Sequence, residues 1–390
     1  GVPVVPGTFW PVILTDAHAE AELLEQADRI GYPVLVKAAA GGGGRGMRRV
    51  DAGTDLIEAV HGAAREATAA FGDGSVYLER YVERARHVEV QLLGDDHGTV
   101  VALGERDCSV QRRHQKLVEE APAPGLTTEQ RLRLHALGIQ VAQTVDLRNA
   151  ATAEFLLTPD GDFWFLEVNA RLQVEHGVTE LVADVDLVHE QIAIAAGAPL
   201  SDRVLAAAAR AAQPVRHAIE VRLSAEDPGN EFTPGPGRIT RWRPASGPGV
   251  RVDAGVEEGS VIPGDYDSLF AKLMVVGADR GAAIARLRRA LAETQICGIQ
   301  STLPFHRWLL EQADFTDESG AGLSTDLVGR TWDPAPLVAA AALRAAELGA
   351  LAARDGSPAR ATGLPGTPAS EPQPSEWWAA GAREAMENRP

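Results

Sequence analysis

Residues 167–175 read Glu-Val-Asn-Ala-Arg-Leu-Gln-Val-Glu, so that a polar residue stands at every second position with an apolar one between. Because side chains alternate between the two faces of an extended strand, this pattern predicts a strand with all five polar groups on one face. A solvated face of an ordinary amphipathic strand is the alternative. The ordered mixture of carboxylate, amide and guanidinium groups, and the apolar run Phe163–Leu166 before it, favour a functional strand. There Arg171 can grip a small planar anion and Glu175 can act as a general base.

A metal site is predicted beside this strand. The segment 155–174 is expected to form two strands joined by a turn at 159–161, and Glu154 lies on the partner strand, where it can face Glu167. The two carboxylates and the amide oxygen of Asn169 form a set of hard oxygen ligands, which suits Mg²⁺ bound with nucleotide phosphates.

A run of glycines upstream predicts a phosphate-binding flap. Residues 41–46, which include Gly42, Gly43 and Gly44, lie between two predicted strands rather than between a strand and a helix, which excludes a dinucleotide fingerprint. No Gly-Lys-Ser/Thr closes the run, which excludes a Walker A loop. Backbone N–H groups of such a flap can contact phosphate oxygens, and Lys37 on the preceding strand can add a positive charge. A flexible structural turn is the alternative.

A second polar cluster covers residues 105–116, where basic residues are dense for an acidic protein. It indicates an anion site, with a solvated charged turn as the alternative. Cys108 in this cluster is expected to be a buried thiol rather than a nucleophile. His87 and His114 have no spacing to other His or Cys residues that is typical of metal ligands.

Length and composition exclude several classes of protein. The 390 residues are enough for two or three packed units, and 45% hydrophobic residues predict a soluble, folded chain. A formal net charge of −17 argues against a nucleic-acid or anionic-membrane binder. Two cysteines exclude a disulfide scaffold and predict a cytoplasmic location. We find no membrane-spanning run and no leader, and the first residue is Gly1, so the chain is expected to be a piece of a longer protein.

Lysine is scarce. It occurs only at Lys37, Lys116 and Lys272, and every other basic residue is arginine. A compact ammonium group is therefore expected to be specifically required at these positions, with chance as an equal alternative for Lys272 inside the apolar stretch 269–276.

Apolar periodicity, caps and breakers predict an α+β layout without alternating βαβ units. Helices are expected at 17–30, from a Thr54 cap to about 71, after a Thr127-x-x-Gln130 capping box, at 186–196, at 282–291 and at 337–354. Strands are expected at 33–37, from about 47, at 76–82, and in a hairpin over 88–102 that turns at 95–98. The stretch 355–376 is rich in Pro, Gly, Ser and Thr, which predicts a flexible linker.

From Gly1 to about Trp332 the sequence resembles the biotin carboxylase component of biotin-dependent acyl-CoA carboxylases, an ATP-grasp enzyme. The matching blocks, in order, are 36–38 with the glycine loop, 86–89, 105–116, 119–122, 165–176, 217–220, 225–228 and 303–306. So many ordered blocks make a coincidence negligible.

The resemblance implies a role for each matching residue. ATP would be contacted by Lys37, Gly42, Gly43, Gly44, Glu79, Arg80, Val82, His87, Gln111, His114, Glu154, Leu156 and Glu167. Mg²⁺ or Mn²⁺ would be held by Glu154, Glu167 and Asn169. Bicarbonate and biotin would be held by Lys116, Arg171, Gln173, Val174, Glu175 and Arg251. Glu175 would deprotonate bicarbonate for attack on the γ-phosphate, and Arg251 would stabilise the enolate-like biotin that accepts CO₂; Lys116 and Arg171 complete the catalytic set.

The resemblance also implies a fold class and domains: an ATP-grasp fold, a biotin carboxylase C-terminal domain and a disordered C-terminal linker. The expected segments are a linker at 1–8 from a preceding α/β domain that is missing here, a lid subdomain with the flap at 9–81, a catalytic subdomain at 82–210, the C-terminal domain at 211–330, a helical extension at 331–354 and a flexible linker at 355–390. Three departures from the family pattern are Gly177 in place of proline, Gly264-Asp265 in place of Pro-Tyr, and one extra residue near Pro159.

The implied partners are a biotin carboxyl carrier and a carboxyltransferase, with a homodimer left open, and neither nucleic acid nor membrane. Biotin would not be attached to this chain, because none of its lysines lies in a Met-Lys-Met motif. The final acceptor is left open among acetyl-CoA, propionyl-CoA, another acyl-CoA, pyruvate and urea. Two alternatives to the carboxylase are another bicarbonate-activating ATP-grasp ligase, such as a carbamoyl phosphate synthase half, and an inactive nucleotide-binding module.

Overall fold

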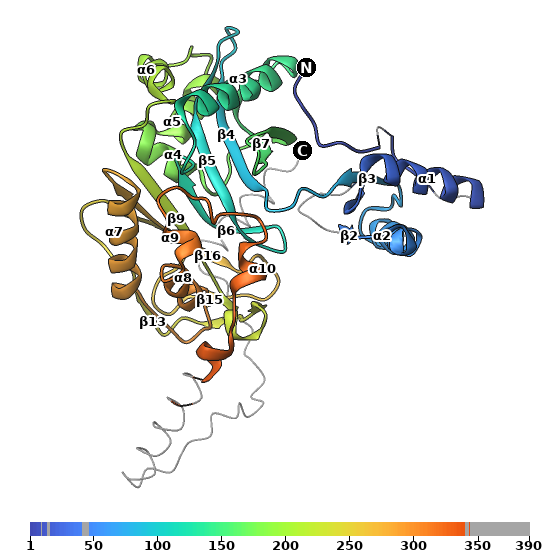
Figure 1. Cartoon of the computed structure of the whole chain (residues 1–390). Helices are drawn as coiled ribbons and strands as arrows, with labels where there is room; N and C mark the ends of the chain where they lie inside the picture. The colour runs from blue at the N-terminus through green and yellow to red at the C-terminus, as the bar shows by residue number, and fades with distance from the viewer. Residues whose placement is uncertain (9, 14–15, 41–46, 340–342, 344–390) are drawn as a thin grey trace, which may run out of the picture. The chain divides into compact units, whose positions relative to one another are not determined.

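The longest run of paired strands is an eight-stranded antiparallel sheet (Figure 1), which carries several of the residues singled out in the sequence, among them Lys116, Glu154 and Arg251. Its strands, in spatial order, are β14 (Val250–Ala254), β16 (Leu269–Gly277), β9 (His217–Ser224), β6 (Gln115–Ala121), β5 (Val100–Arg112), β4 (Arg86–Gly94), β7 (Asn149–Leu157) and β8 (Phe163–Asn169). The inner strands β4 and β5 are buried along most of their length. Charged residues on them are therefore costly unless they are paired, and their pairing builds the site described below.

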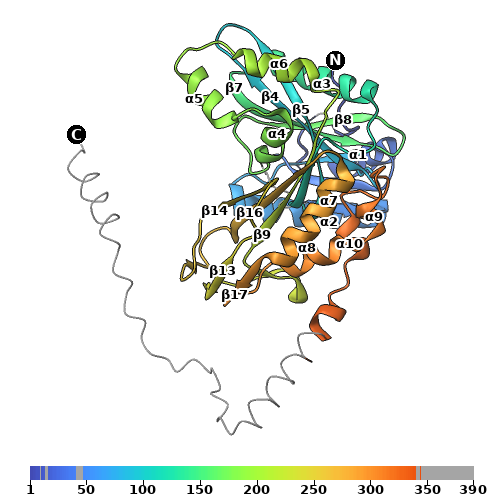
Figure 2. The same cartoon turned by 90° about the vertical axis from the view of Figure 1, so that its left-hand side faces the viewer.

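Helices cover both faces of this sheet (Figures 1 and 2). α3 (Thr128–Thr144) packs on β4 and β5, and α7 (Arg280–Glu293) packs on β16 and β9. α4 (His176–Ala183) contacts β9, β5 and β16. Further along the chain lie α5 (Leu187–Ala195), α6 (Asp202–Arg210), α8 (Leu303–Leu309), α9 (Ala313–Thr316), α10 (Leu327–Thr331) and the 3₁₀ turn η2 (Pro228–Asn230). Small two-stranded sheets pair β10 (Glu226–Asp227) with β11 (Thr233–Pro234), β12 (Gly237–Arg238) with β15 (Val261–Ile262), and β13 (Arg241–Arg243) with β17 (Gln295–Cys297).

Upstream of residue 81 the chain forms a separate three-stranded antiparallel sheet with two helices. Its order is β2 (Arg48–Val50), β1 (Val34–Ala38) and β3 (Val76–Arg80), and its helices are α1 (Ala17–Ile30) and α2 (Leu56–Phe71). Alternation along β1 buries Val34, Val36 and Ala38, and the two valines belong to the core under the helices. Lys37 therefore lies on the opposite face of the strand, away from that core.

The structure is a computed structural model that describes residues 1–8, 10–13, 16–40, 47–339 and 343. The chain divides into two units, Gly1–Pro334 and Ala335–Pro390. The predicted glycine flap at 41–46 and the predicted linker at 355–390 lie outside the described residues, as does most of the predicted helix 337–354. In the described ranges, no helix combines the length and apolar composition needed to cross a membrane.

Most predicted elements are confirmed. α1 has the predicted ends, the hairpin of β4 and β5 turns where expected, and Thr127 forms the predicted capping box with Gln130. The prediction of Thr54 as a helix cap is wrong, because Thr54 lies inside the 3₁₀ turn η1 (Gly53–Asp55) and α2 begins after it at Leu56. Its hydroxyl group contacts the carboxylate of Asp55 at 3.4 Å instead of a helix N–H group.

Candidate active site

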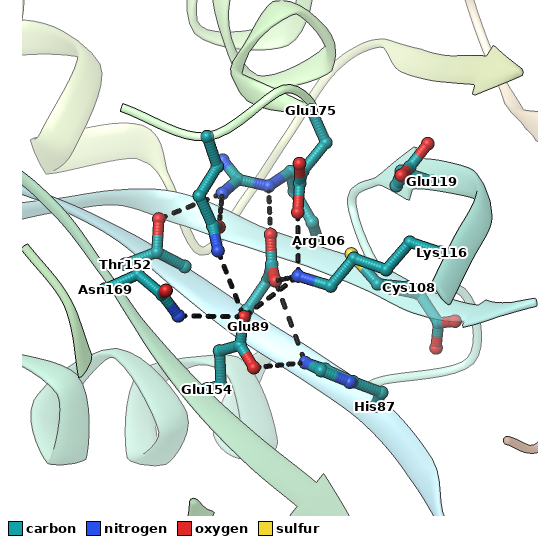
Figure 3. Close-up of polar contacts among 12 residues, drawn as sticks. His87, Glu89, Arg106, Cys108, Lys116, Glu119, Thr152, Glu154, Asn169 and Glu175 are labelled. Carbon is teal, nitrogen blue, oxygen red and sulfur yellow. Dashed lines mark hydrogen bonds and ion pairs between the residues drawn. The ribbon is translucent and has the colours of Figure 1, made fainter. Parts of the chain in front are cut away.

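Lys116 is the centre of the site (Figure 3). Its ammonium group, on β6, donates hydrogen bonds to Glu89 Oε2 at 2.6 Å, Glu175 Oε1 at 2.7 Å and Glu154 Oε1 at 2.9 Å. Burial lowers the pKa of Lys116, but the three carboxylates more than offset this, so its pKa is well above the usual value. One ligand atom each from His87, Glu89 and Glu154 lies within 4.8 Å of the other two, a spacing compatible with a metal ion, and a lysine supplies the positive charge at this point.

Three carboxylates and one arginine stand in a row across four strands. Arg106 on β5 pairs with Glu89 on β4, Glu89 with Glu154 on β7, and Glu154 with Glu167 on β8. The prediction that Glu154 and Glu167 face each other is thus confirmed. Glu89 was missed as a site residue, although it lies within the block 86–89 that carried part of the resemblance. Burial raises its pKa, yet Lys116 and Arg106 bring the pKa of Glu89 down to about 2, so it is a carboxylate at neutral pH.

Arg106 is a fully buried hub. It donates hydrogen bonds to Glu89 at 2.6 Å, to Gln91 at 2.7 Å and to the Gln173 side chain at 3.3 Å. Its remaining bonds go to Thr179 on α4 at 2.9 Å and Thr152 on β7 at 3.1 Å. Because these contacts occupy its donors, Arg106 holds the site together and is not itself a free anion-binding group.

The other arginines of the basic cluster 105–116 lie away from this centre. Arg113 forms an ion pair with Glu231 at 2.9 Å, and Arg112 donates to the backbone carbonyl of the same residue. Of the basic residues predicted as one anion site, the structure therefore brings only Lys116 and the buried Arg106 to the carboxylates.

The stretch 167–175 is not one strand. β8 ends at Asn169, the chain then loops, and Glu175 is the residue that immediately precedes α4. The prediction of an extended strand through Glu175 is wrong, because tertiary contacts bend the chain: Arg106 binds the side chain of Gln173, and Lys116 binds Glu175.

The polar groups of this stretch still converge. Gln173 Nε2 donates to Glu154 Oε1 at 3.0 Å, and Asn169 Nδ2 donates to Glu154 Oε1 and to Glu167 Oε1, both at 3.2 Å. Arg171 stays exposed and donates to Asn169 Oδ1 at 3.2 Å. The amide nitrogen of Asn169 thus marks a point on which the two carboxylates converge.

Glu175 is 2% exposed and lies between two cations. Oε1 accepts from Lys116, and Oε2 accepts from Arg222 of β9 at 3.0 Å. Burial and the charge of Glu89 raise the pKa of Glu175. The positive charges of Lys116, Arg222 and Arg106 lower it by more, so the net pKa is below the usual value. Arg222 was missed because it is distant in sequence and belongs to a different predicted domain.

His87 and Gln111 border the carboxylates on the side of β4 and β5. Gln111 Nε2 lies 2.8 Å from His87 Nδ1 and also 2.8 Å from the carbonyl oxygen of Cys108. An amide N–H donated to Nδ1 leaves the ring proton on Nε2, which lies 3.1 Å from Glu154 Oε2. Cys108 is fully buried, as predicted, and burial raises the pKa of its thiol well above the usual value.

The other predicted nucleotide contacts that the structure describes lie on two sheets or in the segments next to their strands. Lys37 forms an ion pair with Glu79 of β3 at 2.9 Å, and Arg80 is the last residue of that strand. Leu156 of β7 pairs with His87. His114 lies in the turn between β5 and β6, where burial and the charge of Lys37 lower its pKa. Val82 follows β3 and is half-buried. Gly42, Gly43 and Gly44 lie outside the described residues.

Arg251 forms a second centre beside α4. It lies on β14, donates to Asp253 at 2.9 and 2.8 Å, and donates to Glu180 of α4 at 2.7 Å. A pocket of about 520 Å³ opens here, lined by His176, Glu180 and Arg251 among others. Arg251 is thus bound to α4, the helix that Glu175 precedes.

Two family models match the chain. "Carbamoyl-phosphate synthase L chain, ATP binding domain" covers residues 1–203, and "Biotin carboxylase C-terminal domain" covers residues 220–328. Among curated proteins, the chain is 48% identical to a biotin carboxylase of Nostoc sp. over 81% of this chain and 68% of the relative. It is 47% identical to a pyruvate carboxylase subunit of Methanothermobacter thermautotrophicus over 81% of this chain and 62% of the relative. It is 45% identical to the biotin-dependent acyl-coenzyme A carboxylase alpha3 subunit of Mycobacterium leprae over 85% of this chain and 54% of the relative.

Solved structures agree with these matches. A biotin carboxylase of Campylobacter jejuni in complex with β,γ-ATP superposes with a TM-score of 0.78 at 42% identity, covering 85% of this chain and 71% of that one. The biotin carboxylase domain dimer of a 2-oxoglutarate carboxylase from Hydrogenobacter thermophilus, with ADP, magnesium and bicarbonate, gives a TM-score of 0.77 at 40% identity, covering 84% and 70%. The chain spans roughly half to two thirds of the length of the curated relatives named above.

Proposed function

This chain belongs to the biotin carboxylases of the ATP-grasp fold, and from that membership we propose that it carries out the ATP-dependent carboxylation of biotin with bicarbonate. One observation supports the proposal most strongly. Glu175 is a buried, ionised carboxylate held between Lys116 and Arg222, and it lies next to the carboxylates that converge on Asn169. This combination offers a base, a cationic centre for a small anion and an acidic site for a cation-bound nucleotide.

The residues fit a divalent cation bound with ATP. The two carboxylates of Glu154 and Glu167 are cross-strand neighbours, and both accept from the amide of Asn169. An amide can rotate to present its oxygen, so the three groups form a set of hard oxygen donors of the kind that Mg²⁺ prefers. When bound, Mg²⁺ would neutralise phosphate charge. The same three residues are the ones the sequence assigned, and Mg²⁺ is the ion we propose.

Glu175 is proposed as the base. It would take the proton of bicarbonate while a bicarbonate oxygen bonds to the γ-phosphorus and the bond from phosphorus to the β,γ-bridging oxygen breaks, giving carboxyphosphate and ADP. A carboxylate already ionised at neutral pH can accept this proton without prior activation. Lys116, Arg171, Gln173 and the backbone of Val174 would hold the bicarbonate, and Lys116 would exchange part of its carboxylate contacts for the substrate.

Arg251 is proposed to serve the second step. Carboxyphosphate breaks down to CO₂ and phosphate, phosphate takes the N1 proton of biotin, and the new bond forms between N1 and CO₂. The negative charge that develops on the ureido oxygen would be met by the Arg251 guanidinium beside the pocket of about 520 Å³. Its bonds to Asp253 and Glu180 fix the direction in which that group points.

The proposal extends to partners and acceptor. Biotin would arrive on a carrier protein, and a carboxyltransferase would pass the carboxyl group to an acyl-CoA, as the name of the Mycobacterium leprae relative suggests. A homodimer is supported by the domain dimer of the Hydrogenobacter thermophilus structure. A cytoplasmic location belongs to the same proposal, because Cys108 and Cys297 are both free, as thiols are in reducing compartments.

Phosphate release tests the proposal. The purified chain is given MgATP, bicarbonate and free biotin, beside a longer polypeptide in which the preceding α/β domain of the family is fused to Gly1. Biotin-stimulated, bicarbonate-dependent release by either polypeptide is expected. Phosphate release that requires bicarbonate but does not depend on biotin would favour another bicarbonate-activating ligase. Nucleotide binding without any release would overturn the proposal in favour of a binding module.

A further inference from the structure

Three neighbouring strands present a grid of five charged residues and one methionine on one face of the large sheet. The register places Asp253, Lys272 and Arg222 in one row across β14, β16 and β9, and Arg251, Met274 and Glu220 in the next row. Residues of the alternate positions, such as Leu273 and Val275, point to the other face and belong to the hydrophobic core. The grid therefore faces α4 and the loop before it rather than the core.

Lys272 lies in the middle of this grid and is 9% exposed. Its ammonium group donates a hydrogen bond to the backbone carbonyl of Val174, and it lies 3.7 Å from Asp253 Oδ2 and 3.8 Å from Glu220 Oε2. The Val174 carbonyl belongs to the same peptide group as the N–H of Glu175. Lys272 thus holds the peptide unit that carries the proposed base.

We propose that Lys272 is a positioning residue for the carboxylation, and that its ammonium group joins the loop of Glu175 to the strand of Arg251. This inference rests on the proposed function of that site. The connection runs from the Val174 carbonyl through Lys272 to Asp253, and from Asp253 to Arg251, which binds Glu180 of α4. Glu175, proposed for the first step, and Arg251, proposed for the second, are thereby fixed to one another through Lys272.

The neighbours of Lys272 explain why a compact ammonium group is needed. Asp253 already accepts two hydrogen bonds from Arg251, and Arg222 lies opposite on β9, so a second planar guanidinium would compete for the same space and partner. In the described structure neither carboxylate oxygen of Glu220 has a hydrogen-bond partner. Burial and the charge of Glu119 raise the pKa of Glu220, so Glu220 is a poor counter-ion. The bond to Val174 and the charge of Asp253 are therefore the main support of the ammonium group.

Lys272→Met tests this role, because methionine keeps the length of the side chain and removes the donor. We expect the KM for bicarbonate to rise about 10-fold to 100-fold with a lower kcat, since a small displacement of a positioned group has effects of this size. The KM for MgATP should stay unchanged, because Lys272 contacts none of the proposed nucleotide residues. Hydrogen–deuterium exchange should increase in the peptide 170–176, while the strand 217–224 keeps its protection.

Val275→Ala is the matched control. Val275 lies on the same strand, is fully buried and faces the hydrophobic core, so its truncation weakens the sheet without touching the grid. We expect it to lower the melting temperature and to leave both KM values and the protection of 170–176 unchanged. The same loss of protection in both variants would show that Lys272 is merely structural and would overturn the inference.

Lys272→Arg keeps the positive charge and provides a second test if the methionine variant does not fold. Its wider head group must displace the Val174 carbonyl, so the same local loss of protection and the same rise in KM are expected. Wild-type protection and KM in the arginine variant would overturn the inference. Absence of biotin-stimulated phosphate release by both wild-type polypeptides, this chain and the longer fused one, would instead contradict the proposed function. The exchange measurement would still decide whether Lys272 holds the loop.

Discussion

The side chains of this site are charged because oppositely charged groups surround them, and not because they are exposed to solvent. Lys116 keeps its proton because three carboxylates surround it, and Glu89 and Glu175 stay ionised because cations outweigh the cost of burial. Removing any one charge would leave another buried and unpaired, which is costly. The residues of the site are therefore best tested by substitutions that keep shape and change one property.

Glu175→Gln keeps the shape of the side chain and removes the base. We expect bicarbonate-dependent ATP cleavage to fall by at least about 100-fold, the usual contribution of a general base, with little change in the affinity for MgATP. Phosphate release and nucleotide titration measure the two quantities. Because the pKa of Glu175 lies below its usual value of 4.5, the wild-type carboxylate is ionised throughout the neutral range, and its protonation should reduce the rate only below about pH 4.5.

Glu190→Gln is the control for this prediction. Glu190 is a buried glutamate on α5 that accepts a hydrogen bond from Ser201 at 2.7 Å, away from the site. It should retain wild-type turnover. Near-normal turnover by Glu175→Gln would remove Glu175 from the role of base.

Between elements, a few buried contacts decide how strands and helices are joined. α4 packs directly on β16 at Gly177, the position where the family usually has proline, and a Cβ atom there would lie 2.3 Å from Met274 Sδ. On the other face of the sheet, Glu120 of β6 accepts from His217 of β9 at 2.7 Å and from Arg280 of α7 at 2.7 and 2.9 Å. The contact of Gly177 with Met274 is steric, and the contact of Glu120 with His217 and Arg280 is electrostatic. Each leads to a separate prediction.

Gly177→Ala should destabilise the protein by about 1–3 kcal/mol, the usual cost of forcing an extra methyl group into a filled core. Met274→Val in the same chain should recover part of this loss, because it removes the sulfur that the new methyl group meets. Gly281→Ala in α7 is the control, since a Cβ there finds only ordinary contacts at 3.5 Å or more. Denaturant unfolding of the single and double variants gives the coupling, and purely additive effects would contradict the steric explanation.

Glu120 should make the fold sensitive to acid. Its pKa is about 2 in the folded protein against 4.5 in the unfolded chain, because Arg280 and His217 outweigh the effect of burial. Glu120 therefore contributes about 3 kcal/mol to the free energy of unfolding. This contribution is fully present above pH 4.5 and is lost as the pH falls towards 2. Urea unfolding as a function of pH measures the loss.

Glu120→Gln should lower the free energy of unfolding by about 3 kcal/mol at pH 7, since the buried Arg280 loses its counter-ion, and should flatten the profile below pH 4.5. Glu293→Gln on α7, which removes an exposed pair with Arg289, should change it by less than about 1 kcal/mol. A variant profile as steep as that of the wild-type protein would show that other carboxylates carry the acid sensitivity.

At the scale of the molecule, one continuous sheet links regions that the sequence divides into domains. β6 and β9 pair from Val118 with Val221 to Ala121 with Ala218, across the predicted boundary between residues 210 and 211. The ion pair of Arg222 with Glu175 and the bond of Lys272 to Val174 cross the same boundary. The site is therefore assembled from residues on both sides of the predicted boundary between residues 210 and 211. The subdivision into domains at that boundary stays a prediction.

Splitting the chain between Arg210 and Ala211 should prevent independent folding, because each piece would expose an unpaired inner strand and unpaired buried charges. We expect neither 1–210 nor 211–334 to show a cooperative thermal transition alone, and co-expression to restore one. Circular dichroism on heating measures this. A cooperative transition of 211–334 alone would show that the C-terminal part is an independent domain.

The sequence alone identified the family and many side chains of the candidate site, because these depend on residue type and on order along the chain. It also predicted α1, the capping box at Thr127 and the hairpin of β4 and β5, whose signals are local. It failed where distant residues act: the buried Arg106 and Lys116 end the strand at Asn169 and turn Glu175 inward. Arg222 and Lys272 reach the site from strands far along the chain. Only the tertiary structure decides such contacts, because the free energy of pairing a buried charge depends on neighbours that no local pattern records.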